Sequence, residues 1–445
     1  MGERAPTPPN PATPDSDGGA AQVPFAEAFA VWLRIGFISF GGAAGQIALM
    51  HRMLVEERRW LSEPRFLHAL NFCMLLPGPE AMQLATYSGW LLHGWRGGLV
   101  AGLLFVLPGA VVVVALTWIY AVFGGTGIVG ALFLGVKAAV LAIVIQALIS
   151  IARRALKRRL GLAIAFAALI AIAAFDVAFP LVVLAAGVLG FFAARNGGAA
   201  PGPVEIAAGE PAVSWRQTLS TTLLWLTIWL APLGLLVLLL GPGHILAQLG
   251  WFFSKLAVVT FGGAYAVLAY MAQQAVESYG WLTAGEMADG LGLAETTPGP
   301  LILVTVFVGF LAGWPGGTGL ALGATVVTLW VTFAPCFLWI MAGAPHVERL
   351  RGNPGLAGAL SAITAAVVGV ITNLALWFGL HVVFAELVTA RWGPVSLLVP
   401  RLGTIDPGAA LLFAVACVSL FVARLGIIST LGICAALGLV FRYLP

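Results

Sequence analysis

The chain has 445 residues, of which 60% are hydrophobic and only 9% are charged. An ordinary soluble domain carries about 25% charged residues, and a soluble fold of this length could not stay hydrated with so few. The composition therefore excludes a cytosolic enzyme, a nucleic-acid-binding protein and a disordered protein, and it predicts an all-α polytopic membrane protein. The net charge of +4 then reflects loops that anchor the protein at the membrane surface, not a nucleic-acid partner.

The N-terminal stretch 1–24 is rich in proline and lacks an apolar core, so we expect a disordered tail and not a signal peptide. Apolar segments then follow one another almost to the end of the chain, and a helix needs about 20 such residues to span the hydrocarbon core. We predict about thirteen transmembrane helices, of which 160–175 and 180–194 are short enough to be a hairpin instead. The predicted spans are 25–50, 66–94, 97–123, 127–152, 160–175, 180–194, 218–241, 244–271, 286–312, 316–342, 355–380, 407–423 and 425–443.

Residues 40–79 align with residues 261–300 without a gap, at a constant offset of 221, and fourteen of the forty positions are identical. The identities include FGGA at the start of both segments and PGP at the end. Such a rigid register indicates an internal duplication. We therefore expect two transmembrane repeats, 25–195 and 218–445, joined by the polar linker 196–217.

The two repeats are predicted to have opposite topology. Seven predicted spans separate equivalent points, and an odd number inverts the second copy, with 218–241 as the extra inverting helix. Inverted repeats are a recurring architecture of secondary transporters. The Lys and Arg residues of the loops favour a cytoplasmic N-terminus, mainly through RRALKRR at 153–159. That basic run is alternatively a site for an anionic partner.

Three cations fall inside predicted spans, namely Arg34, Lys137 and Lys255. A charge at the bilayer centre costs about 2.5–3.5 kcal/mol or more, so each is a candidate substrate-binding residue. Arg34 and Lys255 are equivalent in the two repeats, six residues before each FGG, and inverted halves can bring them together across a pseudo-twofold axis. The alternative is that each side chain snorkels to the interface or pairs with a carboxylate.

Each PGP motif lies inside an apolar run, where Pro removes a backbone donor and Gly relaxes the chain. We expect both motifs to break their spans into half-helices whose N-terminal amides and positive dipole end attract an anion. Matching broken helices in two repeats indicate a transporter's binding site, and a plain proline kink is the alternative. The substrate-binding candidates here are Gly78, Pro79 and Glu80 in the first repeat and Gly299 and Pro300 in the second.

The glycines of the FGG motifs, Gly41 and Gly42 with Gly262 and Gly263, are further candidates for substrate binding. In one interpretation they open the backbone at matched places, so that free amides join the anion site. In the other they only permit close contact between helices.

Four titratable residues near the PGP motifs are candidates for coupling transport to protons. Glu295 precedes the second PGP at a helix C-terminus, where the dipole and burial both disfavour its charge, so it is the better proton carrier. Glu80 follows the first PGP, where the dipole favours its ionised form and capping is the simpler role. His68 and Asp289 occupy equivalent positions and are weaker candidates. Both glutamates alternatively neutralise the intramembrane cations.

No sequence feature indicates an enzyme or a resident cofactor. A Walker A motif is absent, which argues against ATP-driven pumping. No His, Cys or Asp cluster has the spacing of a metal site, and no nucleophile has an identifiable companion base. We therefore expect no cofactor and no metal, and the oligomeric state stays open, a homodimer included.

Two blocks of sequence resemble those of the chromate ion transporter (CHR) family in its long, two-domain form. They are FGGAAGQIALMHRMLVEERRWLSEPRFLHALNFCMLLPGPEAMQLATYSGWLLHGWRGG at 40–98 and FGGAYAVLAYMAQQAVESYGWLTAGEMADGLGLAETTPGPLILVTVFVGFLAG at 261–313. The resemblance covers nearly the whole chain, although Ala43 stands where the family commonly has Pro. It implies a bacterial inner-membrane exporter of chromate that confers chromate resistance, has halves of opposite topology and is coupled to the proton-motive force. It also implies sulfate as a related or competing anion.

A chromate dianion fits these features physically, because two cations balance its charge and two half-helix N-termini donate to its oxygens. A charge that crosses the membrane potential is worth about 2.3 kcal/mol per 100 mV, so a dianion that leaves a negative interior gains about 4.6 kcal/mol. Export therefore needs no ATP. The alternatives are a sulfate or other oxyanion importer or exchanger and, from another class, a membrane-embedded enzyme or scaffold.

Overall fold

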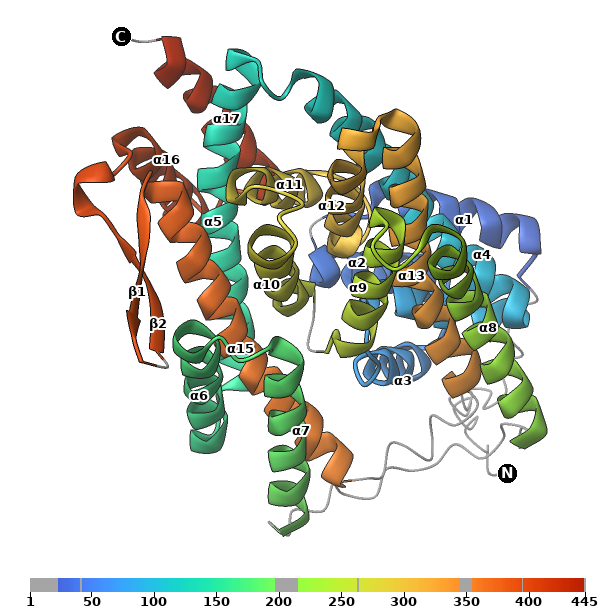
Figure 1. The fold of residues 1–445 in the computed structure, drawn as a ribbon. Coiled ribbons are helices and arrows are strands. Elements are labelled where there is room, and N and C mark those ends of the chain that lie inside the picture. The colour runs from blue at the N-terminus through green and yellow to red at the C-terminus, as the bar shows by residue number, and fades with distance from the viewer. Residues whose placement is uncertain are drawn as a thin grey trace, which may run out of the picture.

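The computed structural model describes residues 23–40, 42–196, 215–261, 264–344, 354–393 and 395–443, and these form a mostly helical molecule (Figure 1). In chain order the helices are α1 (Phe25–Ile38), α2 (Gly42–His51), η1 (Arg52–Glu57), α3 (Glu63–Cys73), α4 (Glu80–Phe123), α5 (Gly127–Ala155), α6 (Arg159–Phe175), α7 (Phe179–Asn196), α8 (Trp215–Leu240), α9 (Ile245–Val259), α10 (Ala264–Gln273), η2 (Gln274–Ser278), α11 (Ala284–Thr296), η3 (Leu301–Leu303), α12 (Val304–Gly313), η4 (Trp314–Gly316), α13 (Thr318–Gly343), α15 (Pro354–Val383), η6 (Leu402–Thr404), α16 (Pro407–Cys417), η7 (Val418–Val422) and α17 (Ile427–Tyr443).

Within the described ranges, five helices are long and apolar enough to cross a membrane, namely α4, α5, α8, α13 and α15. The shortest of them have 26 residues, which at 1.5 Å per residue is more than the roughly 30 Å of a hydrocarbon core. Shorter apolar helices include α6, α7, α9, α16 and α17. The chain at 160–194 forms two short helices, α6 and α7, which follow each other across a three-residue turn.

Four of the thirteen predicted spans are pairs of short helices instead of continuous ones. The chain breaks at both FGG motifs, between α1 and α2 and between α9 and α10. It also breaks at both PGP motifs, between α3 and α4 and between α11 and α12. The PGP breaks follow from the missing amide of proline and the left-handed glycine between the two prolines, with φ of +124° at Gly78 and +95° at Gly299. Gly41, Gly262 and Gly263 lie outside the described residues.

After the FGG break the first repeat turns back toward the end at which it started. Arg58, just after η1, forms an ion pair with Glu27 in the first turn of α1. In the second repeat Phe252 of α9 contacts Tyr279, just after η2, at 5.5 Å between ring centroids. Both FGG segments are therefore re-entrant pairs of helices, which a count of apolar residues cannot distinguish from a span.

The PGP segments double back in the same way. Phe72 near the end of α3 lies 5.4 Å from Tyr87 of α4 between ring centroids. In the second repeat a Cβ added at Gly290 of α11 would lie only 2.4 Å from the Phe307 ring of α12. Helix α4 is itself folded at His93 and Gly94, which have non-helical backbone angles, so its first part, 80–92, packs against the start of its second part, 95–123.

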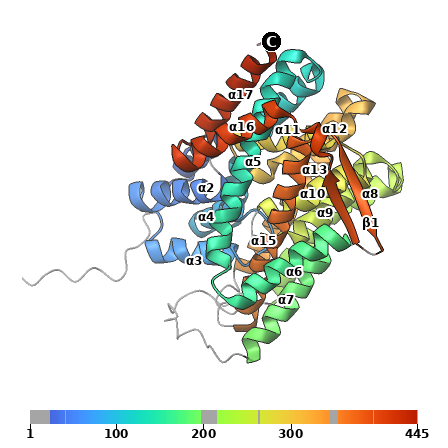
Figure 2. The same ribbon diagram turned by 90° about the vertical axis from the view of Figure 1, so that its left-hand side faces the viewer.

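The helices form two groups that lie side by side in Figure 1. One group contains α1, α4, α8, α9, α12 and α13, and the other contains α5, α6, α7, α15, α16 and α17. Within the second group α6 and α7 pack against α15, whereas α16 and α17 pack against α5. The two pairs lie at opposite ends of the group (Figures 1 and 2). Each half of the sequence thus supplies the pair of helices that packs on the long helix of the other half.

A small antiparallel β-hairpin departs from the predicted all-α fold. Strands β1 (Leu387–Trp392) and β2 (Val395–Pro400) pair with Trp392 opposite Val395. Their sequences, LVTARW and VSLLVP, are rich in β-branched residues and are joined through Gly393, whose φ of +62° suits a tight turn. The predicted spans do not cover this stretch, and the sequence analysis does not predict strands there.

Candidate functional site

The two repeats meet at two backbone hydrogen bonds that are equivalent at the offset of 221. The amide of Gly299 donates to the carbonyl of Ser39, and the amide of Gly78 donates to the carbonyl of Thr260, both at 2.8 Å. Ser39 and Thr260 directly follow α1 and α9, where the chain breaks before FGG. We call these two contacts the crossings. At each crossing the PGP motif of one repeat is held by the FGG break of the other.

Close packing fixes each PGP motif against a long helix of the other repeat. A Cβ added at Gly109 of α4 would lie 2.2 Å from the carbonyl oxygen of Pro298. On the other side a Cβ at Gly78 would lie 3.0 Å from the Sγ atom of Cys336 of α13. Either addition is tighter than ordinary contact, so the backbone of each motif lies directly against its neighbour.

Three half-helix N-termini open beside the crossings. Glu80 begins α4 directly after Pro79, and Leu301 begins η3 directly after Pro300, so each second proline stands one position before the first helical turn and not within it. Gly42 begins α2 with a φ of +68° and has open space where a side chain would be. The first amides of a helix lack partners within the helix and carry its positive dipole end, so these termini favour an anion.

The equivalent cations Arg34 and Lys255 are both exposed, although their neighbours on α1 and α9 are buried. Neither of them forms an ion pair with any residue that the structure describes. Each cation stands about one turn before a crossing, on the helix that ends there.

The third cation, Lys137 of α5, is paired. Its Nζ atom lies 3.3 Å from Oδ1 of Asp289 on α11, and the hydroxyl of Tyr120 on α4 donates to Oδ2 of the same carboxylate at 2.8 Å. Asp289 is 4% exposed. Burying this carboxylate is possible because a cation and a hydroxyl compensate its charge. Two residues predicted for different roles, Lys137 and Asp289, thus meet in one contact between the two repeats.

The remaining titratable candidates are spread over the PGP segments. Glu295 is buried near the end of α11, His68 is half-buried on α3, and Glu80 is half-buried at the start of α4. Glu80 follows the crossing residue Gly78 by two positions, and Glu295 precedes the crossing residue Gly299 by four. Their roles in proton coupling remain predictions.

Sequence reasoning missed two buried glutamines at the motifs. The Nε2 atom of Gln46 on α2 donates to the carbonyl of Gly299 at 2.6 Å and lies 3.4 Å from that of Ser39. The Nε2 atom of Gln83 on α4 donates to the carbonyl of Pro77 at 2.7 Å. The signal that could have identified both is a glutamine inside an otherwise apolar run. A buried side-chain amide needs a hydrogen-bond partner, so such a residue indicates a polar contact.

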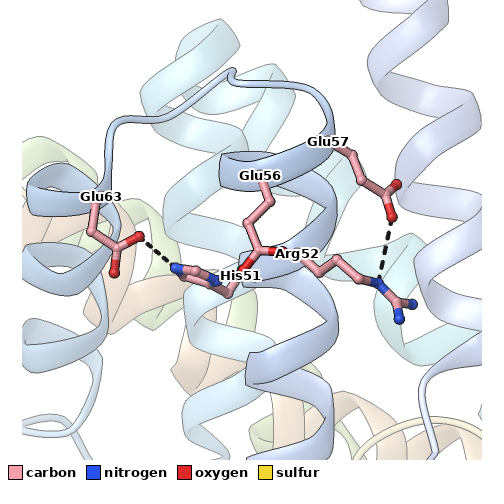
Figure 3. A network of polar contacts seen from close by, with 5 residues as sticks. All are labelled: His51, Arg52, Glu56, Glu57 and Glu63. Carbon is pink, nitrogen blue, oxygen red and sulfur yellow. Dashed lines mark hydrogen bonds and ion pairs between the residues drawn. The ribbon is translucent and has the colours of Figure 1, made fainter.

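A charged network lies where the first re-entrant pair ends (Figure 3). His51 at the end of α2 contacts Glu56 at 3.1 Å and Glu63 at the start of α3 at 2.5 Å. Arg52 lies 3.5 Å from Glu57. The side chains of Arg52, Glu56, Glu57 and Glu63 are all more than half exposed.

Comparison with known proteins identifies the family. A sequence model described as "Chromate transporter" matches residues 26–191 and 247–439. The chain is 35% identical over 351 residues to the "Chromate transport protein" of Pseudomonas aeruginosa, which covers 78% of this chain and 79% of the relative. It is 30% identical over 347 residues to the "Chromate transport protein" of Cupriavidus metallidurans, covering 77% of this chain and 79% of the relative. No solved structure matches. The chain therefore belongs to the chromate transporter family, as a multi-pass membrane protein in its long form.

Proposed function

We propose that this chain is a secondary transporter that exports chromate across the inner membrane and so confers chromate resistance. Relatives named chromate transport proteins support the substrate. The membrane potential supplies the driving force, because a dianion that leaves a negative interior gains about 4.6 kcal/mol per 100 mV. The N-terminus lies in the cytoplasm in this proposal, on the side favoured by the basic run RRALKRR.

The observation that carries the proposal is the pair Arg34 and Lys255. Both are exposed and without an ion-pair partner among the described residues, at equivalent places just before the crossings. A cation that faced lipid would be costly, so these side chains line a path open to water or to an anion. Two such cations together match the charge of a tetrahedral dianion, and the N-termini of α2, α4 and α12 supply donors for its oxygens.

Opposite orientation of the repeats is part of the proposal. Because the FGG and PGP segments double back, five membrane-spanning segments separate equivalent points: the second part of α4, then α5, α6, α7 and α8. Five is odd, as seven was in the sequence-based count, so the second repeat is inverted with α8 as the inverting helix. Equivalent motifs then open toward opposite sides of the membrane, which suits alternating access.

Proton coupling is assigned to the carboxylates at the PGP segments, with Asp289 and Glu295 as the candidates. Asp289 deserves the first test, because its charge is balanced by Lys137 on a different helix. A change in its protonation would alter a contact between repeats. Coupling to the proton-motive force would add to the driving force from the potential.

Counterflow in proteoliposomes tests the function. Purified protein is reconstituted with unlabelled chromate inside, and entry of labelled chromate is followed with and without an imposed potential, with sulfate as the competing anion. The proposal expects chromate exchange that responds to the potential. Exchange of sulfate without chromate would indicate a sulfate transporter, and no movement of either anion would contradict transport of oxyanions by this chain.

A further inference from the structure

The two crossings share the same backbone bond but differ in their side chains. At the second, the hydroxyl of Thr260 donates to the carbonyl of Leu256 at 2.6 Å, so it is satisfied within its own helix. At the first, the hydroxyl of Ser39 is fully buried and has no hydrogen-bond partner among the described residues. The equivalent residues Ser39 and Thr260 therefore differ in their hydroxyl groups, because only the hydroxyl of Ser39 is left available to a ligand.

The carbonyl of Ser39, by contrast, is well supplied with donors. It accepts from the amide of Gly299 at 2.8 Å and lies 3.4 Å from Nε2 of Gln46. The position equivalent to Gln46 in the second repeat is Val267, so this polar group is also confined to the first crossing. A buried hydroxyl without a partner is destabilising, and such a group calls for an explanation such as a ligand that it binds.

The surroundings of Ser39 indicate what that use is. Three residues later Gly42 begins α2, with open space beside its α-carbon. The amides in the first turn of α2 have no partner within the helix, so they favour binding of an anion. Arg34, on α1 and five residues before Ser39, adds an exposed cation. All of these groups donate hydrogen bonds or carry positive charge.

We propose that the hydroxyl of Ser39 donates a hydrogen bond to an oxygen of the transported oxyanion, next to the first-turn amides of α2. The ligand class is a fully ionised tetrahedral oxyanion, whose every oxygen accepts hydrogen bonds. The Thr260 crossing serves the fold alone. This inference rests on the proposed function, since it concerns how that transported anion is recognised.

The test compares Ser39→Ala, Ser39→Thr and the matched control Thr260→Val in the reconstituted full chain. Ser39→Ala is expected to raise the KM for chromate about tenfold or more, because a hydrogen bond to a charged group is lost. Ser39→Thr keeps the hydroxyl and is expected to restore a KM within about threefold of the wild type. Thr260→Val is expected to leave the KM almost unchanged.

Thermal unfolding of the same proteins in detergent gives a second readout. Replacing an unpartnered buried hydroxyl by hydrogen is expected to leave the Tm without ligand unchanged or higher. The upward shift of Tm with added chromate is expected to shrink in Ser39→Ala alone. A wild-type KM in Ser39→Ala, equal effects of Ser39→Ala and Thr260→Val, or a lower Tm in Ser39→Ala without ligand would each overturn the inference. Absence of chromate transport by the wild-type protein would instead contradict the proposed function.

Discussion

The amide of Gly299 lies 2.8 Å from the carbonyl oxygen of Ser39, although the two residues belong to different repeats. The same bond, displaced by 221 positions, joins Gly78 to Thr260. A backbone hydrogen bond in an apolar interior is costly to break, because no water is there to replace the lost partner of the amide or the carbonyl. The two crossings therefore tie each broken helix to the other repeat, and they set the distance between the motifs that surround the proposed anion path.

The left-handed glycines of the PGP motifs are expected to tolerate no side chain. Gly299→Ala places a Cβ at a φ of +95° and 2.8 Å from the Leu303 side chain, so we expect a loss of about 1–3 kcal/mol in stability and loss of chromate exchange. Gly319→Ala is the matched control, because this glycine of α13 has open space around its α-carbon. Tm in detergent and exchange in proteoliposomes measure both. Equal behaviour of the two variants would argue against a strained motif.

The re-entrant first segment predicts that Glu27 and Arg58 lie on the same side of the membrane, because their side chains form an ion pair. Single cysteines at these two positions are expected to react with a membrane-impermeant maleimide from one side only, and from the same side. A continuous span over 25–50 would place them on opposite sides. The native thiols give little background, since Cys73, Cys336 and Cys434 are buried and Cys417 is half-buried.

The contact between Lys137 and Asp289 predicts a double-mutant effect. Asp289→Asn leaves the cation without its carboxylate and Lys137→Met does the reverse, so each is expected to lower stability by about 1–3 kcal/mol. The double variant removes both charges and is expected to lose less than the sum, with a coupling of about 1 kcal/mol. Tyr120→Phe keeps the ion pair and is expected to cost less than either. Strict additivity in thermal unfolding would mean that the two charges do not interact.

Sequence reasoning was most reliable where a residue's own chemistry decides the backbone. Both PGP breaks were predicted, because proline lacks an amide and glycine permits a positive φ. The internal duplication was likewise visible in residues alone, and the helices follow it: α1, α2, η1 and α3 recur as α9, α10, η2 and α11.

The sequence could not predict where the chain turns back within a segment, nor which residues of the two repeats contact each other. The helices α1 and α2 together have about as many apolar residues as one span, so hydropathy could not reveal that the chain turns back between them. The β-hairpin was missed because six-residue strands give a weak signal beside long helices. The contact of Lys137 with Asp289 joins residues from different repeats, and only the packing of α5 against α11 brings them together.

Exchange of chromate by charge-neutral variants of the equivalent cations Arg34 and Lys255 tests the central claim most directly. Arg34→Gln and Lys255→Gln are compared in proteoliposomes with Arg216→Gln, which removes an exposed cation from the first turn of α8. The account predicts that each of the first two raises the KM for chromate about tenfold or more, at unchanged insertion and Tm, whereas Arg216→Gln transports like the wild type. Wild-type exchange by both Arg34→Gln and Lys255→Gln would contradict an anion path lined by these two residues.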